Sequence, residues 1–229
     1  MRPRVIIHNA VSLDGRITGF EVDMRRYYAL ASTWKEDATL CGSGTILAAP
    51  EGRVREKDEC EPRRKPDPGD RRPLLVVADS RGRVRCWSML LGAGFWRDGV
   101  ALCSRRTPAR HIEYLRRRGV SRIVTDGSRV DLRRALVRLQ TRYKVRTIRV
   151  DSGGTLNAAL LRAGMVDELS LLVHPALAGT LARPLFAGAK PQNRSFRLLS
   201  QARLPGGLVW LRMLAVGDGR RALTRWSPG

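Results

Sequence analysis

Strand-like and helix-like patterns alternate along the first two thirds of the chain. Runs of apolar or β-branched residues lie at 5–10, 74–79, 99–104, 121–126 and 145–150. Apolar residues at helical spacing lie at 23–35, 108–118, 132–143 and 155–163. Uninterrupted apolar runs such as LLVVAD at 74–79 are typical of parallel strands that helices cover on both faces. The alternation therefore predicts an α/β fold with a mainly parallel sheet.

The last third of the chain has a different pattern. Segments 168–175 and 206–216 resemble strands, and no helical pattern long enough to form a crossover separates them. We expect them to add antiparallel strands at the sheet edge.

Two further expectations concern residues 38–72. Residues 38–47 are expected to form a short strand that runs into a Gly-Ser-Gly-Thr turn. Residues 51–72, rich in charge and proline, are expected to form an exposed loop within a single domain spanning residues 1–229.

The segment 145–165 reads as a strand, a glycine turn and a helix in immediate succession. Gly153 and Gly154 are expected to form a tight turn with positive φ, Thr155 to cap the helix, and Gly164 to end it. Such a turn directs backbone N–H groups and the positive end of a helix dipole at one spot, which suits a phosphate or pyrophosphate. The alternative is a Gly-Gly turn that serves packing alone.

Polar residues also follow the first strand. The segment HNAVSLDGRITG places Ser12, Asp14 and Gly15 directly after the strand that contains Asn9. The carboxyl ends of strands are where α/β sheets bind ligands. The alternative is an Asp-Gly turn that Ser12 caps.

Composition narrows the class of protein. The chain has 229 residues, 43% of them hydrophobic, but no apolar run of membrane-spanning length, and its N-terminus is too soon interrupted by polar residues for a signal peptide. We expect a cytoplasmic globular protein. Its four cysteines, Cys41, Cys60, Cys86 and Cys103, lack metal-ligand spacing, so free thiols and no metal site are predicted.

The net charge of +22 raises the alternative of a nucleic-acid-binding protein. Arginine occurs in every segment, however, and only 6% of residues are aromatic, so a solvated basic surface is the favoured interpretation and a specific nucleic-acid partner is not expected. Such a surface helps to attract phosphorylated small molecules.

Three motifs together resemble the pyrimidine reductase family of riboflavin biosynthesis. They are SLDGRI at 12–17, GSGT at 42–45 and VDSGGTLNAALLRAGMVDELSLLVHPALAG at 150–179. The resemblance spans residues 5 to about 216, apart from the loop at 51–72. It implies a dihydrofolate-reductase-like, three-layer α/β/α fold with a mixed sheet, NADPH bound across the carboxyl ends of the strands, and a homodimer.

The resemblance also implies roles for individual residues. Asn9, Ser12 and Asp14 correspond to substrate-side positions, and Asp14 is the residue expected to orient the substrate or relay a proton to it. The chain departs from the family at Ala49, where an acidic residue is common, and at Asp151, where glutamate is common. The positions that correspond to cofactor contacts are Gly44, Thr45, Ser80, Arg81, Gly127, Ser152, Gly153, Gly154 and Thr155.

The implied reaction is hydride transfer from NADPH to C1′ of a ribosylamino-pyrimidine 5′-phosphate, which opens the ribose to a ribityl chain. The chain lacks the motif of a fused zinc deaminase, so reduction alone is expected. The substrate is either the diaminopyrimidinone or the deaminated uracil form, and a same-fold reductase of a pterin or another small carbonyl or imine compound is the alternative. His174, Asp167 and Glu168 are expected to be structural.

Overall fold

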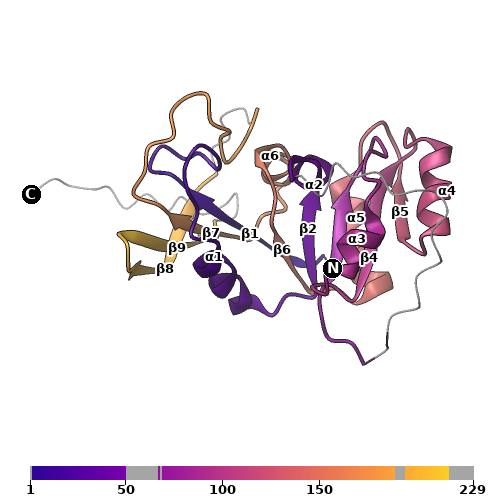
Figure 1. Ribbon diagram of the computed structural model, residues 1–229, viewed down its shortest axis with the longest axis horizontal. Coiled ribbons are helices and arrows are strands. Elements are labelled where there is room, and N and C mark those ends of the chain that lie inside the picture. The colour runs from indigo at the N-terminus through magenta and orange to yellow at the C-terminus, as the bar shows by residue number, and fades with distance from the viewer. Residues whose placement is uncertain (1, 50–66, 68, 189–193, 217–229) are drawn as a thin grey trace, which may run out of the picture.

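The computed structural model describes residues 2–49, 67, 69–188 and 194–216, so most of the loop expected at 51–72 lies outside the described residues. All nine strands belong to one sheet, in the order β5–β4–β3–β2–β6–β1–β7–β9–β8 (Figure 1). The strands are β1 Arg4–Val11, β2 Ala38–Gly42, β3 Leu74–Ala78, β4 Asp98–Ser104, β5 Ser121–Thr125, β6 Thr147–Val150, β7 Glu168–Val173, β8 Phe196–Leu204 and β9 Leu208–Ala215.

The first seven strands in this order are parallel, and β9 and β8 are antiparallel to their neighbours. This confirms the mixed α/β sheet and its antiparallel addition. The helices are α1 Met24–Ala31, followed by a 3₁₀ turn at Ser32–Trp34, then α2 Ser43–Ala48, α3 Trp87–Gly92, α4 Ala109–Arg117, α5 Leu132–Tyr143 and α6 Gly154–Arg162. Within the described residues, none of them is long and apolar enough to span a bilayer.

Helices cover both faces of the parallel part of the sheet. On one face, Leu136 of α5 and Leu160 of α6 share a core with Val76 of β3. On the other face, Trp87 of α3 and Leu115 of α4 belong to a second core with strand residues that include Val77. Because successive residues of a strand face opposite sides, both faces can be apolar only if the run is uninterrupted, as in LLVVAD.

Three elements differ from the sequence-based expectation. Strand β2 ends at Gly42, where the Gly-Ser-Gly-Thr segment begins, but residues Ser43–Ala48 form the short helix α2 instead of the expected turn. Helix α3 and strand β8 were not predicted. Helix α3 has only six residues, and most residues of β8 are exposed, so neither has a clear apolar pattern.

Candidate functional site

The carboxyl ends of β2, β3 and β6 and the first turns of α2 and α6 open onto a cleft of about 740 Å³. Figure 1 shows α2 and α6 next to each other above the ends of β2 and β6. Most residues predicted to contact the cofactor line this cleft, namely Gly44, Thr45, Ser80, Arg81, Ser152, Gly153, Gly154 and Thr155. Gly127 is not among the lining residues. Its φ of +93° turns the chain so that the next residues, Ser128 and Arg129, reach the cleft.

The Gly-Gly turn has a different conformation from the one expected. Gly153 precedes the helix with φ −79° and ψ 168°, and Gly154 is already the first helical residue. The prediction of positive φ is therefore wrong, and so is the prediction that Thr155 caps the helix, because α6 begins one residue earlier. Gly164 does have a φ of +64°, just beyond the end of α6.

The two glycines are required for different reasons. A Cβ atom on Gly154 would lie 2.2 Å from the carbonyl oxygen of Pro184 and 2.8 Å from the backbone nitrogen of Ala187, so no other residue fits without a backbone shift. A Cβ atom on Gly153 would meet only Thr45 Oγ1, at 3.8 Å. Glycine at 154 thus allows close packing of α6 against the 184–187 segment, whereas glycine at 153 leaves space in the cleft.

Hydroxyl groups join the two turns that line the cleft. Ser152 Oγ accepts a hydrogen bond from the Gly42 amide at 3.0 Å and lies 3.1 Å from Thr45 Oγ1. Thr45 Oγ1 in turn accepts a hydrogen bond from the Gly153 amide at 3.1 Å. No side chain among the described residues caps α6. Its first amides are therefore available to an anion in the cleft.

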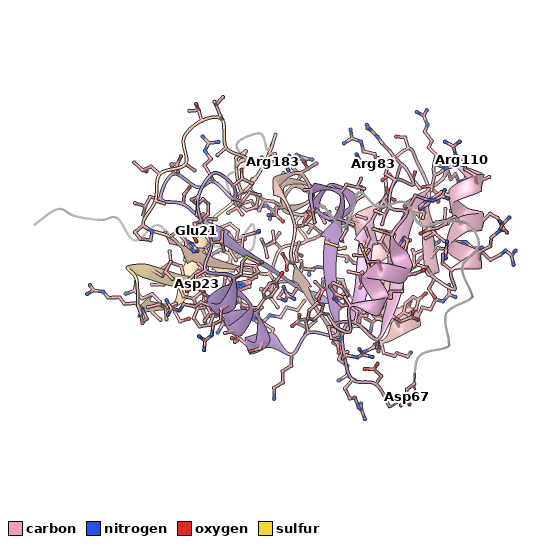
Figure 2. All side chains as sticks on the ribbon, in the orientation of Figure 1. Glu21, Asp23, Asp67, Arg83, Arg110 and Arg183 are labelled. Carbon is pink, nitrogen blue, oxygen red and sulfur yellow. The ribbon has the colours of Figure 1, made fainter. Side chains whose placement is uncertain are left out.

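The cleft is strongly electropositive. Among the residues that the structure describes, five arginines and no carboxylate line it. Arg83 is fixed in place, because its backbone amide donates to Asp79 at 2.7 Å and its guanidinium donates to Ser43 Oγ at 3.0 Å. Figure 2 shows Arg83 and Arg183 at the same end of the sheet as α2 and α6. The five are Arg81, Arg83, Arg106, Arg129 and Arg183.

Ser80 has three hydrogen bonds beside the cleft, one of them from Ser104 Oγ to its carbonyl oxygen at 3.2 Å. Its Oγ accepts a hydrogen bond from the Val130 amide at 3.0 Å, and its carbonyl oxygen accepts one from Thr107 Oγ1 at 2.9 Å. Ser80 therefore connects the loop after β3 to the loop after β5. Ala49 follows α2 directly, and the chain beyond it lies outside the described residues, so its effect stays open.

Asn9 is buried below the Gly-Gly turn and does not line the cleft. Its Nδ2 donates to the Ser152 carbonyl oxygen at 3.0 Å, and its Oδ1 accepts from Asn157 Nδ2 at 2.9 Å. Asn9 therefore links β1 to the turn and to α6. These hydrogen bonds hold the Gly-Gly turn in place. The substrate role expected for Asn9 stays a prediction.

Hydrogen bonds of Ser12 and Asp14 connect the loop after β1 to the 176–179 segment. Ser12 Oγ donates to Asp14 at 2.6 Å, and the Asp14 carboxylate accepts from the amides of Ala178 at 3.0 Å and Gly179 at 2.9 Å. The Ser12 hydroxyl, followed by the two amides, lowers the pKa of Asp14 to about 2. The Asp14 carboxylate is therefore ionised near neutral pH, and its expected action on the substrate stays a prediction.

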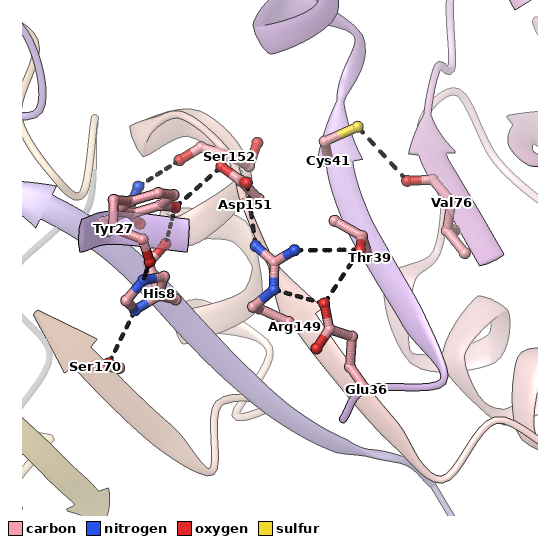
Figure 3. A network of polar contacts seen from close by, with 11 residues as sticks. His8, Tyr27, Glu36, Thr39, Cys41, Val76, Arg149, Asp151, Ser152 and Ser170 are labelled. Atoms are coloured by element: carbon pink, nitrogen blue, oxygen red, sulfur yellow. Dashed lines mark hydrogen bonds and ion pairs between the residues drawn. The ribbon is translucent and has the colours of Figure 1, made fainter. Parts of the chain in front are cut away.

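A buried charged network lies beside the end of β6 (Figure 3). The Arg149 guanidinium donates to Glu36 at 2.7 Å, to Asp151 at 3.1 Å and to Thr39 at 3.4 Å. Burial lowers the pKa of Arg149, but the Asp151 and Glu36 carboxylates more than offset this and raise it. Arg149 thus remains charged and holds Asp151, the residue that precedes the turn.

Tyr27 connects this network to α1. Its hydroxyl lies 2.8 Å from the His8 carbonyl oxygen and 3.1 Å from the Asp151 carboxylate. The His8 ring lies 2.9 Å from Ser170 Oγ and 3.1 Å from the Tyr27 carbonyl oxygen, and burial lowers its pKa to about 4. His8 is therefore neutral and structural near neutral pH, and Asp151 is held from two sides.

The other acidic and histidine candidates have structural contacts, as expected. His174 Nε2 accepts from the Asp23 amide at 3.2 Å. Asp167 pairs with Arg2 at 2.6 Å, and the fully buried Glu168 pairs with Arg4 and Arg212.

The sequence comparisons identify the family. The profile of the RibD C-terminal domain family matches residues 3–210. The chain is 32% identical over 219 residues to the 2,5-diamino-6-ribosylamino-4(3H)-pyrimidinone 5′-phosphate reductase of Archaeoglobus fulgidus, covering 91% of this chain and 97% of that protein. It is 33% identical over 189 residues to the protein of the same name from Methanothermobacter thermautotrophicus, covering 78% and 81%. The chain belongs to the RibD C-terminal domain family, the pyrimidine reductases of riboflavin biosynthesis.

Solved structures have the same fold. A pyrimidine reductase-like protein from Corynebacterium diphtheriae aligns with a TM-score of 0.71 at 18% identity, over 94% of this chain and 93% of that one. The riboflavin biosynthesis reductase Rib7 of Saccharomyces cerevisiae aligns with a TM-score of 0.64 at 18% identity, over 94% and 90%. These alignments confirm the dihydrofolate-reductase-like fold expected from the sequence motifs.

Proposed function

We propose that this protein is an NADPH-dependent reductase that converts the ribosyl group of a ribosylamino-pyrimidine 5′-phosphate to a ribityl group. The observation that carries the proposal is the cleft at the strand ends, which five arginines and no carboxylate of the described residues line, in a chain whose relatives are named as reductases of such a compound. Their names favour the diaminopyrimidinone over the uracil form as substrate.

The residues of the cleft fit the phosphates of a dinucleotide and of a sugar phosphate. The uncapped N-terminus of α6 and the open space at Gly153 suit a pyrophosphate. Arg81 and Arg83, on the β3 side, suit the 2′-phosphate that distinguishes NADPH from NADH. Arg183 is adjacent to the segment that packs against α6, and we assign it to the substrate phosphate.

NADPH supplies the hydride, and the protein positions the two reactants. In the net reaction that bound NADPH would support, C1′ would gain the hydride, the bond from C1′ to the ring oxygen would break, and that oxygen would take up a proton to become a hydroxyl. Gly44, Thr45 and Ser152 shape the cofactor side of the cleft, while Asn9, Ser12 and Asp14 belong to the substrate side in this proposal.

Oxidation of NADPH, followed by absorbance with each candidate substrate, tests the function. We expect turnover with the diaminopyrimidinone and slower or no turnover with the deaminated uracil form. Turnover with a dihydropterin instead would assign the chain to another reaction of the same fold. No NADPH oxidation with any of the three compounds would overturn the proposal.

We expect NADPH to bind more tightly than NADH because of Arg81 and Arg83. Replacing both with glutamine should weaken NADPH binding about tenfold to a hundredfold, the usual range for charged hydrogen bonds, and should change NADH binding little. Titration calorimetry measures both. Arg110→Gln, an exposed arginine of α4 that does not line the cleft, is the control. Equal dissociation constants for the two cofactors in the wild type would contradict the assignment.

Asp14→Asn should raise the KM for the substrate or lower kcat while NADPH affinity is unchanged. Asparagine keeps one oxygen that can accept hydrogen bonds from the two amides, but it lacks the negative charge. The variant therefore removes an orienting carboxylate and largely keeps the contact between the two segments. Asp126→Asn, at an exposed aspartate that does not line the cleft, is the matched control. Normal turnover of Asp14→Asn would end the claim, and a large loss of melting temperature with weaker NADPH binding would indicate a purely structural role.

We propose that two chains form a homodimer through the face of β7, β9 and β8. Leu171 pairs with Leu211 and Val173 with Val209 across this face, and all four are only half-buried. Leu198 of β8 is 49% exposed. Light scattering should give the dimer mass for the wild type and the monomer mass for Leu211→Asp. A wild-type monomer at micromolar concentration would remove the proposal.

The proposal includes a single domain and a cytoplasmic location. All nine strands share one sheet, which supports one folding unit. Cys41, Cys86 and Cys103 are buried and free, as is usual in a reducing compartment.

A further inference from the structure

Half of the net positive charge of the chain lies in one segment. Residues 105–146 contain 14 arginines and lysines but only 3 aspartates and glutamates, a net charge of +11 out of +22 for the whole chain. Residues 1–48, by comparison, have a net charge of +1, and residues 147–188 have none. Arginine occurs in every segment, as expected, but half of the net charge lies within residues 105–146.

This segment forms one end of the molecule. It contains α4, the edge strand β5 and α5, which lie together at the end of the sheet opposite the β8–β9 hairpin (Figure 1). All of its 14 cationic residues except Arg118 are exposed. Figure 2 shows Arg110 at α4, on this side of the molecule. The outward surface of α4, β5 and α5 is called the β5 edge below.

Arginines form a row along α5. Arg134, Arg138 and Arg142 follow one another at intervals of four residues, and all three are exposed. Residues at this interval are about 6 Å apart along a helix axis. Like charges at this spacing destabilise a helix. The row therefore opposes the stability of α5, while the core contacts of the helix come from Ala135, Leu136 and Leu139.

A second cleft joins the two helices across the edge strand. It has a volume of about 390 Å³, and Arg116 of α4, Arg122 of β5 and Arg142 of α5 line it, with no acidic residue among the lining side chains. The three carboxylates of the segment already have cationic partners, since Glu113 pairs with Arg116 and Arg117, Asp126 with Arg105 and Arg134, and Asp131 with Arg134. Most of the positive charge of the β5 edge is therefore not neutralised by these carboxylates.

We propose that the β5 edge binds the phosphodiester backbone of a nucleic acid duplex. Arginine matches phosphate through paired, charge-assisted hydrogen bonds. A row of cations about 6 Å apart suits a ligand with closely repeated negative charges, and a duplex carries one charge per roughly 1.7 Å of its axis. A small anion would need only one of these positions.

The same surface is poorly suited to other acidic ligands. Single strands are bound through exposed aromatic rings, but Tyr114 is buried and Tyr143 is half-buried with the Arg142 guanidinium 5.4 Å from its ring centre. An acidic peptide could add to β5 as a strand, but the Arg138 guanidinium already binds the Val124 carbonyl oxygen at 2.5 Å. These contacts leave the duplex backbone as the favoured ligand.

Fluorescence anisotropy with a labelled DNA duplex of mixed sequence tests the proposal across a series of salt concentrations. The variant R134Q/R138Q/R142Q should bind at least tenfold more weakly than the wild type at low salt. Its slope of log affinity against log salt should be shallower by about 2 to 3, since each lost phosphate contact contributes about 0.9. None of the three residues lines the cofactor cleft, so NADPH binding should be unchanged.

The matched control is R25Q/R197Q/R203Q, which removes the same charge from exposed arginines of α1 and β8. The control variant should change duplex affinity by less than about threefold, and its slope of log affinity against log salt should equal that of the wild type. Equal weakening by both triple variants would overturn the proposal, because the binding would then depend on net charge alone. Poly-glutamate or anionic vesicles that displace the duplex at equal charge would overturn it as well. If circular dichroism shows the α5 variant to be unfolded, R122Q, on β5, should still lower the slope by about 0.9.

Discussion

Valine at position 153 is expected to weaken NADPH binding at least a hundredfold and to leave the fold intact. Gly153 has a φ of −79° and a ψ of 168°, which any residue adopts, and its missing Cβ would touch only Thr45. The branched side chain would instead fill the space that a phosphate needs at the first turn of α6. Circular dichroism and calorimetric titration with NADPH measure the two effects separately.

Alanine at position 154 provides the comparison. Its Cβ would overlap the Pro184 carbonyl oxygen, so α6 must move away from the 184–187 segment, at a cost of about 3 kcal/mol or more in the free energy of unfolding. Thermal unfolding should therefore separate the variants, with a large loss of stability for Gly154→Ala and a small one for Gly153→Val. A folded Gly153→Val protein that binds NADPH with wild-type affinity would show that the phosphates lie elsewhere.

Arg149→Ala is expected to lower the free energy of unfolding by about 3 to 5 kcal/mol, the usual effect of removing one partner of a buried ion pair. The side chains of Arg149 and Glu36 are 8% and 9% exposed, so the glutamate would remain in the interior without its cation. For a chain of this length the melting temperature should fall by about 10 °C. Scanning calorimetry measures the change.

A double variant shows whether the ion pair itself causes the loss. Arg149→Met with Glu36→Gln removes both charges and keeps most of the volume, so it should be more stable than Arg149→Ala. If both proteins lose the same stability, the loss comes from the contacts of Arg149 with Asp151 and Thr39, which both variants remove, and not from the unpaired Glu36. If Arg149→Ala unfolds at the wild-type temperature, the network in Figure 3 contributes little to the fold.

The position of the cleft was predictable because the main sequence signals for it are local. The strand, the two glycines and the helix of 145–165 are adjacent in sequence, and their order alone indicates an anion site at a strand end. The reason for the second glycine was not predictable, because it depends on Pro184, thirty residues away. The sequence suggested a special φ, whereas close contact between two backbone segments is what requires Gly154.

The side chains that give the cleft its charge were only partly predictable. Arg106, Arg129 and Arg183 come from three different loops, and arginine is too frequent in this chain for any one of them to stand out. Only the fold brings them to one cleft. For Asn9, the family motif predicts a position on the substrate side, whereas its observed hydrogen bonds connect β1 to Ser152 and Asn157.

The place of β6 in the sheet has a consequence for how the chain folds during synthesis. Strand β1 pairs only with β6 and β7, so it has no neighbouring strand until residues 147–173 have been made. Strands β2 to β5, in contrast, pair in the order in which they are synthesised. Strand β1 contains Val5, Ile6 and Ile7, which are fully buried in the finished fold. These side chains therefore cannot reach their buried positions until more than half of the chain has been synthesised. The Gly-Gly turn, which directly follows β6, can form only at this late step.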